Sequence, residues 1–192
     1  MKYYELSNKE MPWHECGEVL LTGLTCHFER EYDLLQLSRT GPFQPNMTIP
    51  AELIVTDTMK YKLSNSGFEG INFLRVIKRH ITFIDWTNWD LKAKDPQFYP
   101  KYGNPENYLL DLPHSEEVSE KMENVWEVIV PVNGRFIDKF TFNPDNKLLD
   151  LMVSEKRFDN TIRYIVTEKM KNWLEQNQAD WICFKEIKNI IR

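Results

Sequence analysis

Two stretches of the chain carry the same order of apolar and polar residues, 111 positions apart. In the first stretch, the apolar residues before Thr56 predict a strand. Thr56 itself suits a helix N-cap, because its hydroxyl can accept a hydrogen bond from a free first-turn amide. Met59 and Leu63 follow four residues apart, on one helix face. Phe73 then lies in an alternating apolar run that predicts a second strand.

The second copy repeats these steps with the same residue types. The identical pairs are Ile54/Ile165, Val55/Val166, Thr56/Thr167, Met59/Met170, Lys60/Lys171, Leu63/Leu174, Ile71/Ile182 and Phe73/Phe184. Convergent patterning of any capped helix before a strand would produce part of this match, but the shared Ile-Val-Thr and Met-Lys sequences favour a true repeat. Two copies are too few for a solenoid. We therefore expect a β-rich α+β fold, a single domain over 1–192, with few short helices and strand–helix–strand units at about 51–84 and 159–191.

The remaining pattern predicts further strands and one helix. Residues 17–28 predict one or two strands, and residues 108–112 predict another. Residues 113–124 predict a short acidic helix. Asn133 and Gly134 lie between two β-rich runs, which is the strongest short-range sequence signal for a hairpin.

Composition and charge narrow the classes of function. The chain has no run of eighteen apolar residues, and its first residues lack the apolar stretch of a secretion signal. Its three cysteines are an odd number, which is typical of free thiols in a reducing cytoplasm. A net charge of −5 argues against nucleic acid or anionic membrane as a partner, and it is compatible with a basic protein partner. We expect a cytoplasmic protein.

Motifs for cofactor and metal chemistry are missing from the sequence. It contains no Gly-rich phosphate loop, no Ser nucleophile elbow and no Cys-x-x-Cys pair. His14 and Cys16, with Cys26 and His27, are residue types that bind zinc. However, adjacent residues on a strand point to opposite faces, so Cys26 and His27 make a poor ligand pair. We expect no metal, no cofactor and no catalytic residue.

The segment 85–105 is the most suggestive chemically. The acidic and indole side chains at its start are Asp85, Trp86, Trp89, Asp90 and Asp95. Such aromatic residues pack in a core, anchor a protein interface or stack on a sugar ring, and two carboxylates at a defined separation can hydrolyse a glycosidic bond. The predicted acidic helix adds Glu116, Glu120 and Glu123 on one face, which is either solvated or steers a basic partner.

The two copies resemble a known family as a pair. The motifs are Ile54-Val55-Thr56-Asp57 with Phe73 and Ile165-Val166-Thr167-Glu168 with Phe184. Together with the Tyr-rich N-terminus, they are similar to the immunity proteins of bacterial polymorphic toxin systems, a family formerly catalogued as a domain of unknown function. The resemblance covers nearly the whole chain and implies a cytoplasmic α+β protein that binds and blocks a cognate toxin. It supplies no catalytic residue.

We therefore predict a non-catalytic toxin inhibitor. The residues expected to bind the toxin are Asp85, Trp86, Trp89, Asp90, Glu116, Glu120 and Glu123. The alternatives are a carbohydrate-binding protein or glycoside hydrolase that uses the 85–102 segment, and a structural or adaptor protein with another partner. Exposed strand edges in a β-rich fold also leave homodimer pairing open.

Overall fold

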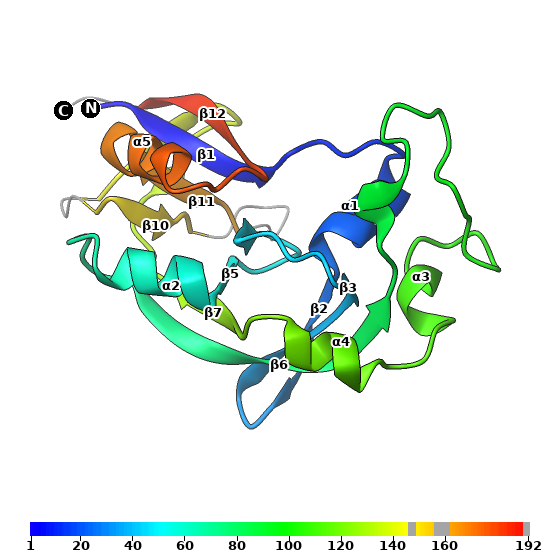
Figure 1. Ribbon diagram of the computed structural model, residues 1–192. Coiled ribbons are helices and arrows are strands. Elements are labelled where there is room, and N and C mark those ends of the chain that lie inside the picture. The colour runs from blue at the N-terminus through cyan, green and yellow to red at the C-terminus, as the bar shows by residue number, and fades with distance from the viewer. Residues whose placement is uncertain (146–148, 156–161, 190–192) are drawn as a thin grey trace.

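The computed structural model describes residues 1–145, 149–155 and 162–189, with the backbone alone at 26–29 and 189. Over these ranges the chain forms two curled, mixed six-stranded sheets with short helices (Figure 1). The expected β-rich α+β fold with two strand–helix–strand units is confirmed. None of the helices in these ranges is both long and apolar enough to cross a membrane.

Both sheets use strands that are distant in sequence. The first sheet has the order β2 (Leu24–Glu31), β3 (Leu34–Gly41), β6 (Asn72–Phe83), β7 (Val125–Ile129), β5 (Ile54–Thr56) and β4 (Met47–Thr48). The second sheet has the order β8 (Arg135–Phe136), β9 (Thr141–Asn143), β12 (Ile182–Asn189), β1 (Tyr3–Asn8), β11 (Tyr164–Thr167) and β10 (Leu151–Val153).

These two orders are the same arrangement built twice. β3 runs parallel to β6 and β9 parallel to β12, whereas every other neighbouring pair is antiparallel. The register also repeats, because Glu127 of β7 faces Ile54 and Glu5 of β1 faces Ile165. The N-terminal strand β1 therefore fills the place in the second sheet that β7 fills in the first. The duplication includes all six strands of each sheet.

One helix belongs to each half, and the two helices begin alike. α2 (Asp57–Ser64) follows β5, and α5 (Glu168–Gln176) follows β11. The hydroxyl of Thr56 accepts a hydrogen bond from the Met59 amide, and that of Thr167 accepts one from the Met170 amide. Both threonines are N-caps in an extended conformation, as the sequence predicts.

The residue with positive φ that follows each helix is a glycine in the first half and a glutamine in the second. Gly67, shortly after α2, has a φ of 78°, and the equivalent Gln178 has a φ of 67°. Glycine adopts this left-handed region without a steric penalty, whereas a residue with a side chain is strained there. The second half therefore keeps the backbone geometry of the first although it lacks the glycine.

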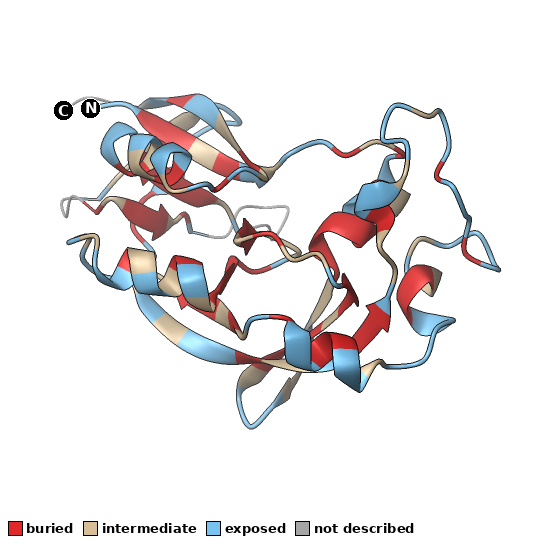
Figure 2. Ribbon diagram, viewed as in Figure 1, coloured by how far each residue is buried: buried red, intermediate tan, exposed pale blue. Residues whose placement is uncertain are grey.

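A shared core joins the halves, and equivalent residues supply it in pairs. The pairs are Leu53/Tyr164, Val55/Val166, Met59/Met170, Leu63/Leu174 and Val128/Leu6. Figure 2 shows buried residues in the strands of both sheets and in both helices. Each half also has a smaller core of its own, with Ile54, Val76 and Val125 in the first matched by Ile165, Ile187 and Tyr3 in the second.

Two segments lie outside the duplicated scaffold and pack together as an added lobe, defined here as residues 9–23 and 84–124. The first connects β1 to β2 and contains α1 (Glu15–Thr22), while the second connects β6 to β7. The second segment contains the 3-10 turn η1 (Trp86–Asn88), α3 (Asn107–Leu110) and α4 (Glu116–Lys121). Their common core consists of Met11, Trp13, Leu20, Leu21, Trp86 and Tyr108. In Figure 1 this lobe lies on the right.

Two predicted strands are helices in the structure. Within 17–28, residues up to Thr22 belong to α1, and the strand begins only at Leu24. Within 108–112, the first three residues belong to α3. Both segments are short apolar runs, which do not distinguish a buried helix from a strand by periodicity alone. The predicted acidic helix is confirmed as α4, with Ser115 as its N-cap.

The prediction of a hairpin at Asn133-Gly134 is also wrong. Gly134 has a positive φ of 95°, as a turn residue does, but the strands on either side belong to different sheets. The Gly134 amide donates to the carboxylate of Asp145 at 2.9 Å instead of closing a hairpin. The turn is the crossing between the halves, and β8 pairs with β9 beyond it.

The shared core predicts that both halves unfold together. Met59→Ala and Met170→Ala remove fully buried side chains from it. Each should lower the free energy of unfolding by about 2–5 kcal/mol, because a cavity remains in a packed core. Urea unfolding followed by circular dichroism should show one transition for each variant. Tyr61→Ala, at a side chain 73% exposed on α2, is the control and should stay within about 0.5 kcal/mol. Two separate transitions would show that the halves are independent.

The left-handed residue after α5 predicts a stabilising substitution. Gln178→Gly should raise the free energy of unfolding by about 1 kcal/mol, since it removes the steric penalty at a φ of 67°. The matched substitution Gly67→Gln should lower it by a similar amount. Thermal unfolding of both variants measures the difference, and a destabilised Gln178→Gly protein would contradict the assigned strain.

Candidate functional site

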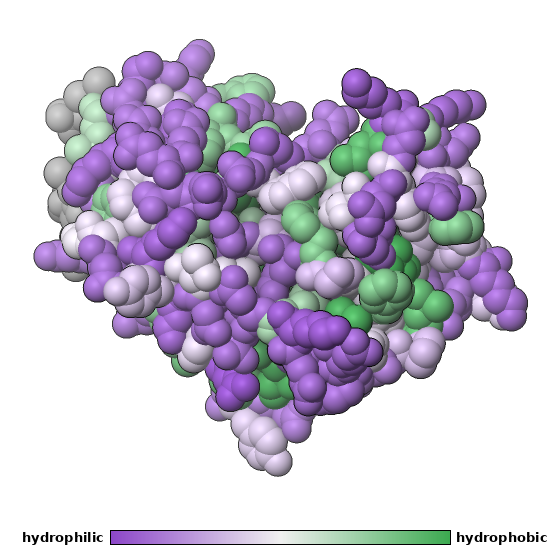
Figure 3. All heavy atoms as spheres, viewed as in Figure 1, coloured by the Kyte–Doolittle hydropathy of each residue, from purple (hydrophilic) through white to green (hydrophobic). Residues whose placement is uncertain are grey.

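The added lobe carries the surplus charge of the protein. Residues 84–124 contain nine Asp or Glu and four Lys or Arg, whereas the rest of the chain is balanced. Large exposed apolar side chains also concentrate here among the described residues, namely Leu91, Phe98, Tyr99, Tyr102, Leu110 and Leu112. In the space-filling view, apolar residues gather around α1, α3 and α4 (Figure 3). Exposed aromatic rings are typical of a protein interface, and acidic side chains around them would steer a basic partner.

Trp86 lies in the core of this lobe. The carboxylate of Asp85 accepts hydrogen bonds from Thr87 Oγ1 at 2.7 Å and Asn88 Nδ2 at 2.6 Å, which builds the η1 turn. The turn points Trp86 inward, where it is 0% exposed and lies edge-on to Phe43. Trp86 therefore cannot contact a partner in this conformation, contrary to its expected role as an anchor. Asp85 shapes the turn.

Trp89 reaches the surface and lines a pocket with other aromatic rings. The half-buried indole of Trp89 lies 5.7 Å from the ring of Phe98 and 6.3 Å from that of Tyr108, between centroids. With Tyr99, these rings line a pocket of about 280 Å³. Asp111 is the single carboxylate among the lining residues. This pocket is where the predicted aromatic segment meets α3.

The other carboxylates of the segment are engaged within their own loop. Asp90 is exposed and accepts the Lys92 amide at 2.9 Å, and Asp95 accepts the hydroxyl of Tyr99 at 2.6 Å. Neither they nor Asp85 line the aromatic pocket. Glycoside hydrolysis generally needs two carboxylates flanking one bond. The arrangement of Asp85, Asp90 and Asp95 does not support that alternative.

The acidic helix is only partly the face that the sequence predicts. Glu116 and Glu120 are exposed on α4, and the carboxylate of Glu116 lies 3.0 Å from His114 Nε2. The helix ends at Lys121, so Glu123 lies beyond it and accepts the Thr58 amide in the first turn of α2 at 2.7 Å. Glu123 therefore caps a helix of the scaffold, although it is exposed like Glu116 and Glu120.

Polar contacts hold the lobe against β6. His114 Nδ1 accepts the Ile81 amide at 2.9 Å, and the ring of His80 lies within 3.0 Å of two carbonyl oxygens next to α3. Lys78 Nζ donates to the carbonyls of Ser119 and Met122 at the end of α4. Burial lowers the pKa of Lys78, and the nearby Arg75 lowers it further. These contacts give the surface a rigid base.

Sequence reasoning missed Tyr108 and Asp111 as pocket residues because it placed them on a strand. The available signal was Pro105, since proline is favoured at the beginning of a helix. α3 begins two residues later and directs the buried ring of Tyr108 toward the loop. Its hydroxyl donates to the carbonyl of Phe98 and so ties the helix to the segment.

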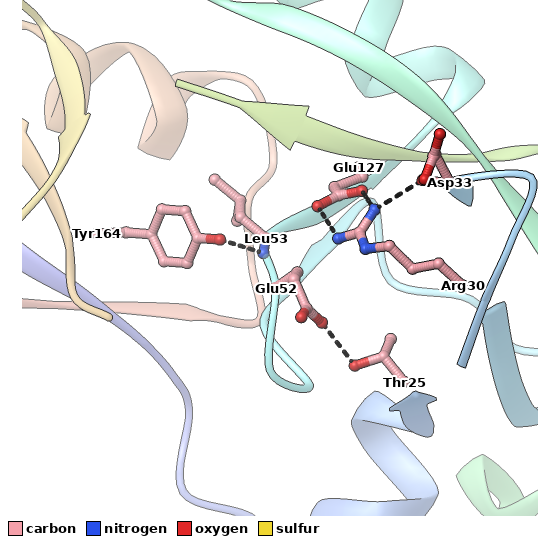
Figure 4. Close-up of polar contacts among 7 residues, drawn as sticks. All are labelled: Thr25, Arg30, Asp33, Glu52, Leu53, Glu127 and Tyr164. Atoms are coloured by element: carbon pink, nitrogen blue, oxygen red, sulfur yellow. Dashed lines mark hydrogen bonds and ion pairs between the residues drawn. The ribbon is translucent and has the colours of Figure 1, made fainter. Parts of the chain in front are cut away.

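A second polar cluster lies near the centre of the molecule (Figure 4). Arg30 donates two hydrogen bonds of 2.8 Å to the two carboxylate oxygens of Glu127, whose side chain is 6% exposed. The hydrogen bond to Glu127 raises the pKa of Arg30. Thr25 Oγ1 donates to the carboxylate of Glu52 at 2.9 Å. These contacts connect β2 to β7 and to Glu52 before β5, neither of which is its neighbour in the sheet.

The same cluster contains a contact between equivalent positions of the repeat. The amide of Leu53 donates to the hydroxyl oxygen of Tyr164 at 2.9 Å, and the two residues are 111 positions apart (Figure 4). Both are buried. Equivalent residues can touch only near the axis that relates the halves, so this hydrogen bond marks that axis.

Candidate metal ligands do not gather elsewhere in the part of the chain that the structure describes. Among the described residues, no three His, Cys, Asp or Glu side chains are placed to hold a metal ion. Cys16 is a free thiol whose pKa is raised by burial. The side chains of Cys26 and His27, two of the metal ligands considered from the sequence, lie outside the described residues.

The hydrogen bond on the axis predicts a loss of stability. Tyr164→Phe leaves the buried Leu53 amide without its acceptor and should cost about 1–3 kcal/mol at pH 7. Burial raises the pKa of Tyr164 to about 12, from an ordinary value of 10.0. The neutral hydroxyl therefore stabilises the fold below pH 10, and this contribution is lost as the pH rises through about 12.

Urea unfolding of wild type and Tyr164→Phe at several pH values from 7 to 11 tests this prediction. The free energy of unfolding of Tyr164→Phe should decline less steeply above pH 10 than that of wild type, because the variant lacks this tyrosine. Tyr61→Phe changes an exposed tyrosine and serves as the control. Equal stability of wild type and Tyr164→Phe at pH 7 would contradict the role of the Leu53 hydrogen bond.

Comparisons of the chain with protein-family models, curated proteins and solved structures found no match.

Proposed function

We propose that this protein is a non-catalytic binding protein that neutralises a cognate toxin by docking through the added lobe. The observation that carries the proposal is the position of the acidic, aromatic surface. Residues 84–124 hold the chain's whole excess of negative charge and its densest group of exposed aromatic rings, and they lie outside the duplicated scaffold. A surface with these two properties attracts a basic protein and then anchors it.

The chemistry of the lobe favours binding over catalysis. Its aromatic pocket has one lining carboxylate, Asp111, and the neighbouring acidic groups are engaged in turns. Arg30 and Glu127 in the central cluster pair with each other. These groups are arranged to hold the fold and to present a surface.

A toxin is the partner that agrees best with the two motifs and with the charge. The repeat resembles the immunity proteins of polymorphic toxin systems, which act in the cytoplasm of the cell that makes the toxin. A toxin that cleaves nucleic acid needs a basic cleft to hold phosphates, and an acidic lobe is complementary to such a cleft. Glu116, Glu120 and Asp90 are among the exposed carboxylates of the lobe, and they would steer the approach.

Co-expression with the product of the neighbouring gene tests the proposal. The neighbour alone should kill cells, and this protein should rescue them and co-purify with it. Phe98→Ala with Tyr99→Ala should weaken the complex by roughly tenfold or more, because both rings are more than half exposed in the lobe. The association rate should fall as salt is raised, since screening removes the steering by Glu116 and Glu120.

Tyr61→Ala is the matched control, because it removes an exposed aromatic ring from α2, outside the lobe. It should leave rescue and affinity unchanged. Isothermal titration and stopped-flow binding measure the two effects, with circular dichroism as a check on folding. A harmless neighbour, or a toxic one that does not bind, would overturn the toxin as partner. If Tyr61→Ala lost as much affinity as the Phe98→Ala, Tyr99→Ala double variant, the lobe would be overturned as the docking surface.

A further inference from the structure

The aromatic pocket of the lobe has the size of a single side chain. Its volume is about 280 Å³, below the roughly 300–1,000 Å³ of pockets that enclose small-molecule ligands. It opens where α3 packs against the end of the 85–105 segment. Four of its ten lining residues are aromatic, namely Trp89, Phe98, Tyr99 and Tyr108.

Hydrogen bonds and ring contacts fix the walls of this pocket before a partner arrives. Tyr99 donates its hydroxyl to Asp95 at 2.6 Å, and Tyr108 donates to the carbonyl of Phe98. Trp89 packs edge-on against Phe98 with an angle of 76° between the rings. A pre-formed site loses less side-chain entropy on binding than a flexible one.

The charge around the pocket selects the sign of its occupant. Asp111 lines the pocket and is exposed, and its side-chain carboxylate forms no hydrogen bond or ion pair with any part of the chain that the structure describes. The face of an aromatic ring carries negative electrostatic potential, which attracts cations. A free carboxylate beside four aromatic rings, in a segment with excess negative charge, favours a cation over a neutral or anionic group.

A lysine of the chain itself already makes a cation–π contact next to the pocket. Lys101 is a lining residue, and its Nζ lies 5.2 Å from the centroid of the exposed Tyr102 ring. This ammonium would repel an incoming cation, so it limits the affinity of the pocket. Lys101 and Asp111 therefore have opposite expected effects on one ligand.

We infer that this pocket binds a lysine or arginine side chain of the protein partner, held by cation–π contacts and by Asp111. The inference rests on the proposed function for the identity of the partner, and it specifies which chemical group of that partner enters the lobe. The pocket is thus the anchoring point, while the exposed carboxylates around it guide the approach.

Small cations test the pocket in the isolated protein. Methylguanidinium and tetramethylammonium are the probes, and the neutral control is tert-butanol, an apolar molecule of similar size. NMR of ¹⁵N-labelled indoles follows the titrations, with the Trp89 signal assigned from Trp89→Phe. Both cations should shift the Trp89 signal, whereas tert-butanol should leave it in place.

Three variants separate cation binding from apolar binding. Asp111→Asn should weaken probe affinity by about threefold, and Lys101→Met should strengthen it by about twofold, as expected for exposed charge pairs. Phe98→Leu keeps an apolar side chain but removes the ring, and it should weaken affinity by about threefold. An equal response to tert-butanol, no response to either cation, or unchanged affinity in Asp111→Asn and Lys101→Met would overturn the inference.

The same variants in the toxin complex test the partner. If Asp111→Asn weakens the complex and Lys101→Met strengthens it, a cationic side chain of the toxin occupies the pocket. If the probes bind but neither variant changes toxin affinity, the partner's side chain lies elsewhere and the inference is overturned. If the probes bind but the rescue assay fails, the pocket is still a cation site, and only the proposal that the partner is a toxin is overturned.

Discussion

The pairing of β1 with β11 and β12 is the interaction on which the rest of the molecule depends. β1 is the central link of the second sheet, since β10 and β11 lie on one side of it and β12, β9 and β8 on the other. Among the described residues, an isolated bridge between Val132 and Val153 is the only other β-contact between β10 and the segment that leads into β8. β1 also brings Leu6 into the core shared by both halves and Tyr3 into the core of the second. Strand pairing and side-chain burial therefore hold the second half together through the same six residues.

Duplication explains why the halves are so similar in geometry and so different in detail. Lys60 lies 3.1 Å from the ring centroid of Trp126, and its equivalent Lys171 lies 5.5 Å from that of Tyr4. Glu127 pairs with Arg30, and the equivalent Glu5 pairs with Arg163. In both halves an aromatic ring lies beside the lysine and an arginine beside the glutamate, but the ring and the position of the arginine differ. The scaffold can therefore tolerate much change while the added lobe specialises.

The sequence predicted the features that depend on local chemistry. The capping threonines and the inward Met59 and Met170 identified the two units, because caps and helical spacing act over a few residues. The sequence did not show that the remaining strands are also duplicated. Leu24 and its equivalent Arg135 occupy matching strand positions, but backbone pairing in a sheet does not require similar side chains. The site was predicted in part: Trp89 lines the pocket, but the burial of Trp86 depends on Phe43 and Trp181, which are distant in sequence. The contact of Glu123 with the Thr58 amide is likewise distant in sequence and was not predicted.

The position of β1 also sets the order in which the chain can fold on the ribosome. All strands of the first sheet have been made once β7 is synthesised, whereas the core that it shares with the second half still lacks the residues of β11 and α5. β1 is made before the first sheet, yet its partners β11 and β12 come last, and Tyr3 must find Thr167 and Ile187. Contacts so distant in sequence form slowly. During translation the apolar residues of β1 therefore stay unpaired until β11 and β12 have been made. An unpaired apolar strand can aggregate or bind a chaperone, and this risk lasts until the end of synthesis.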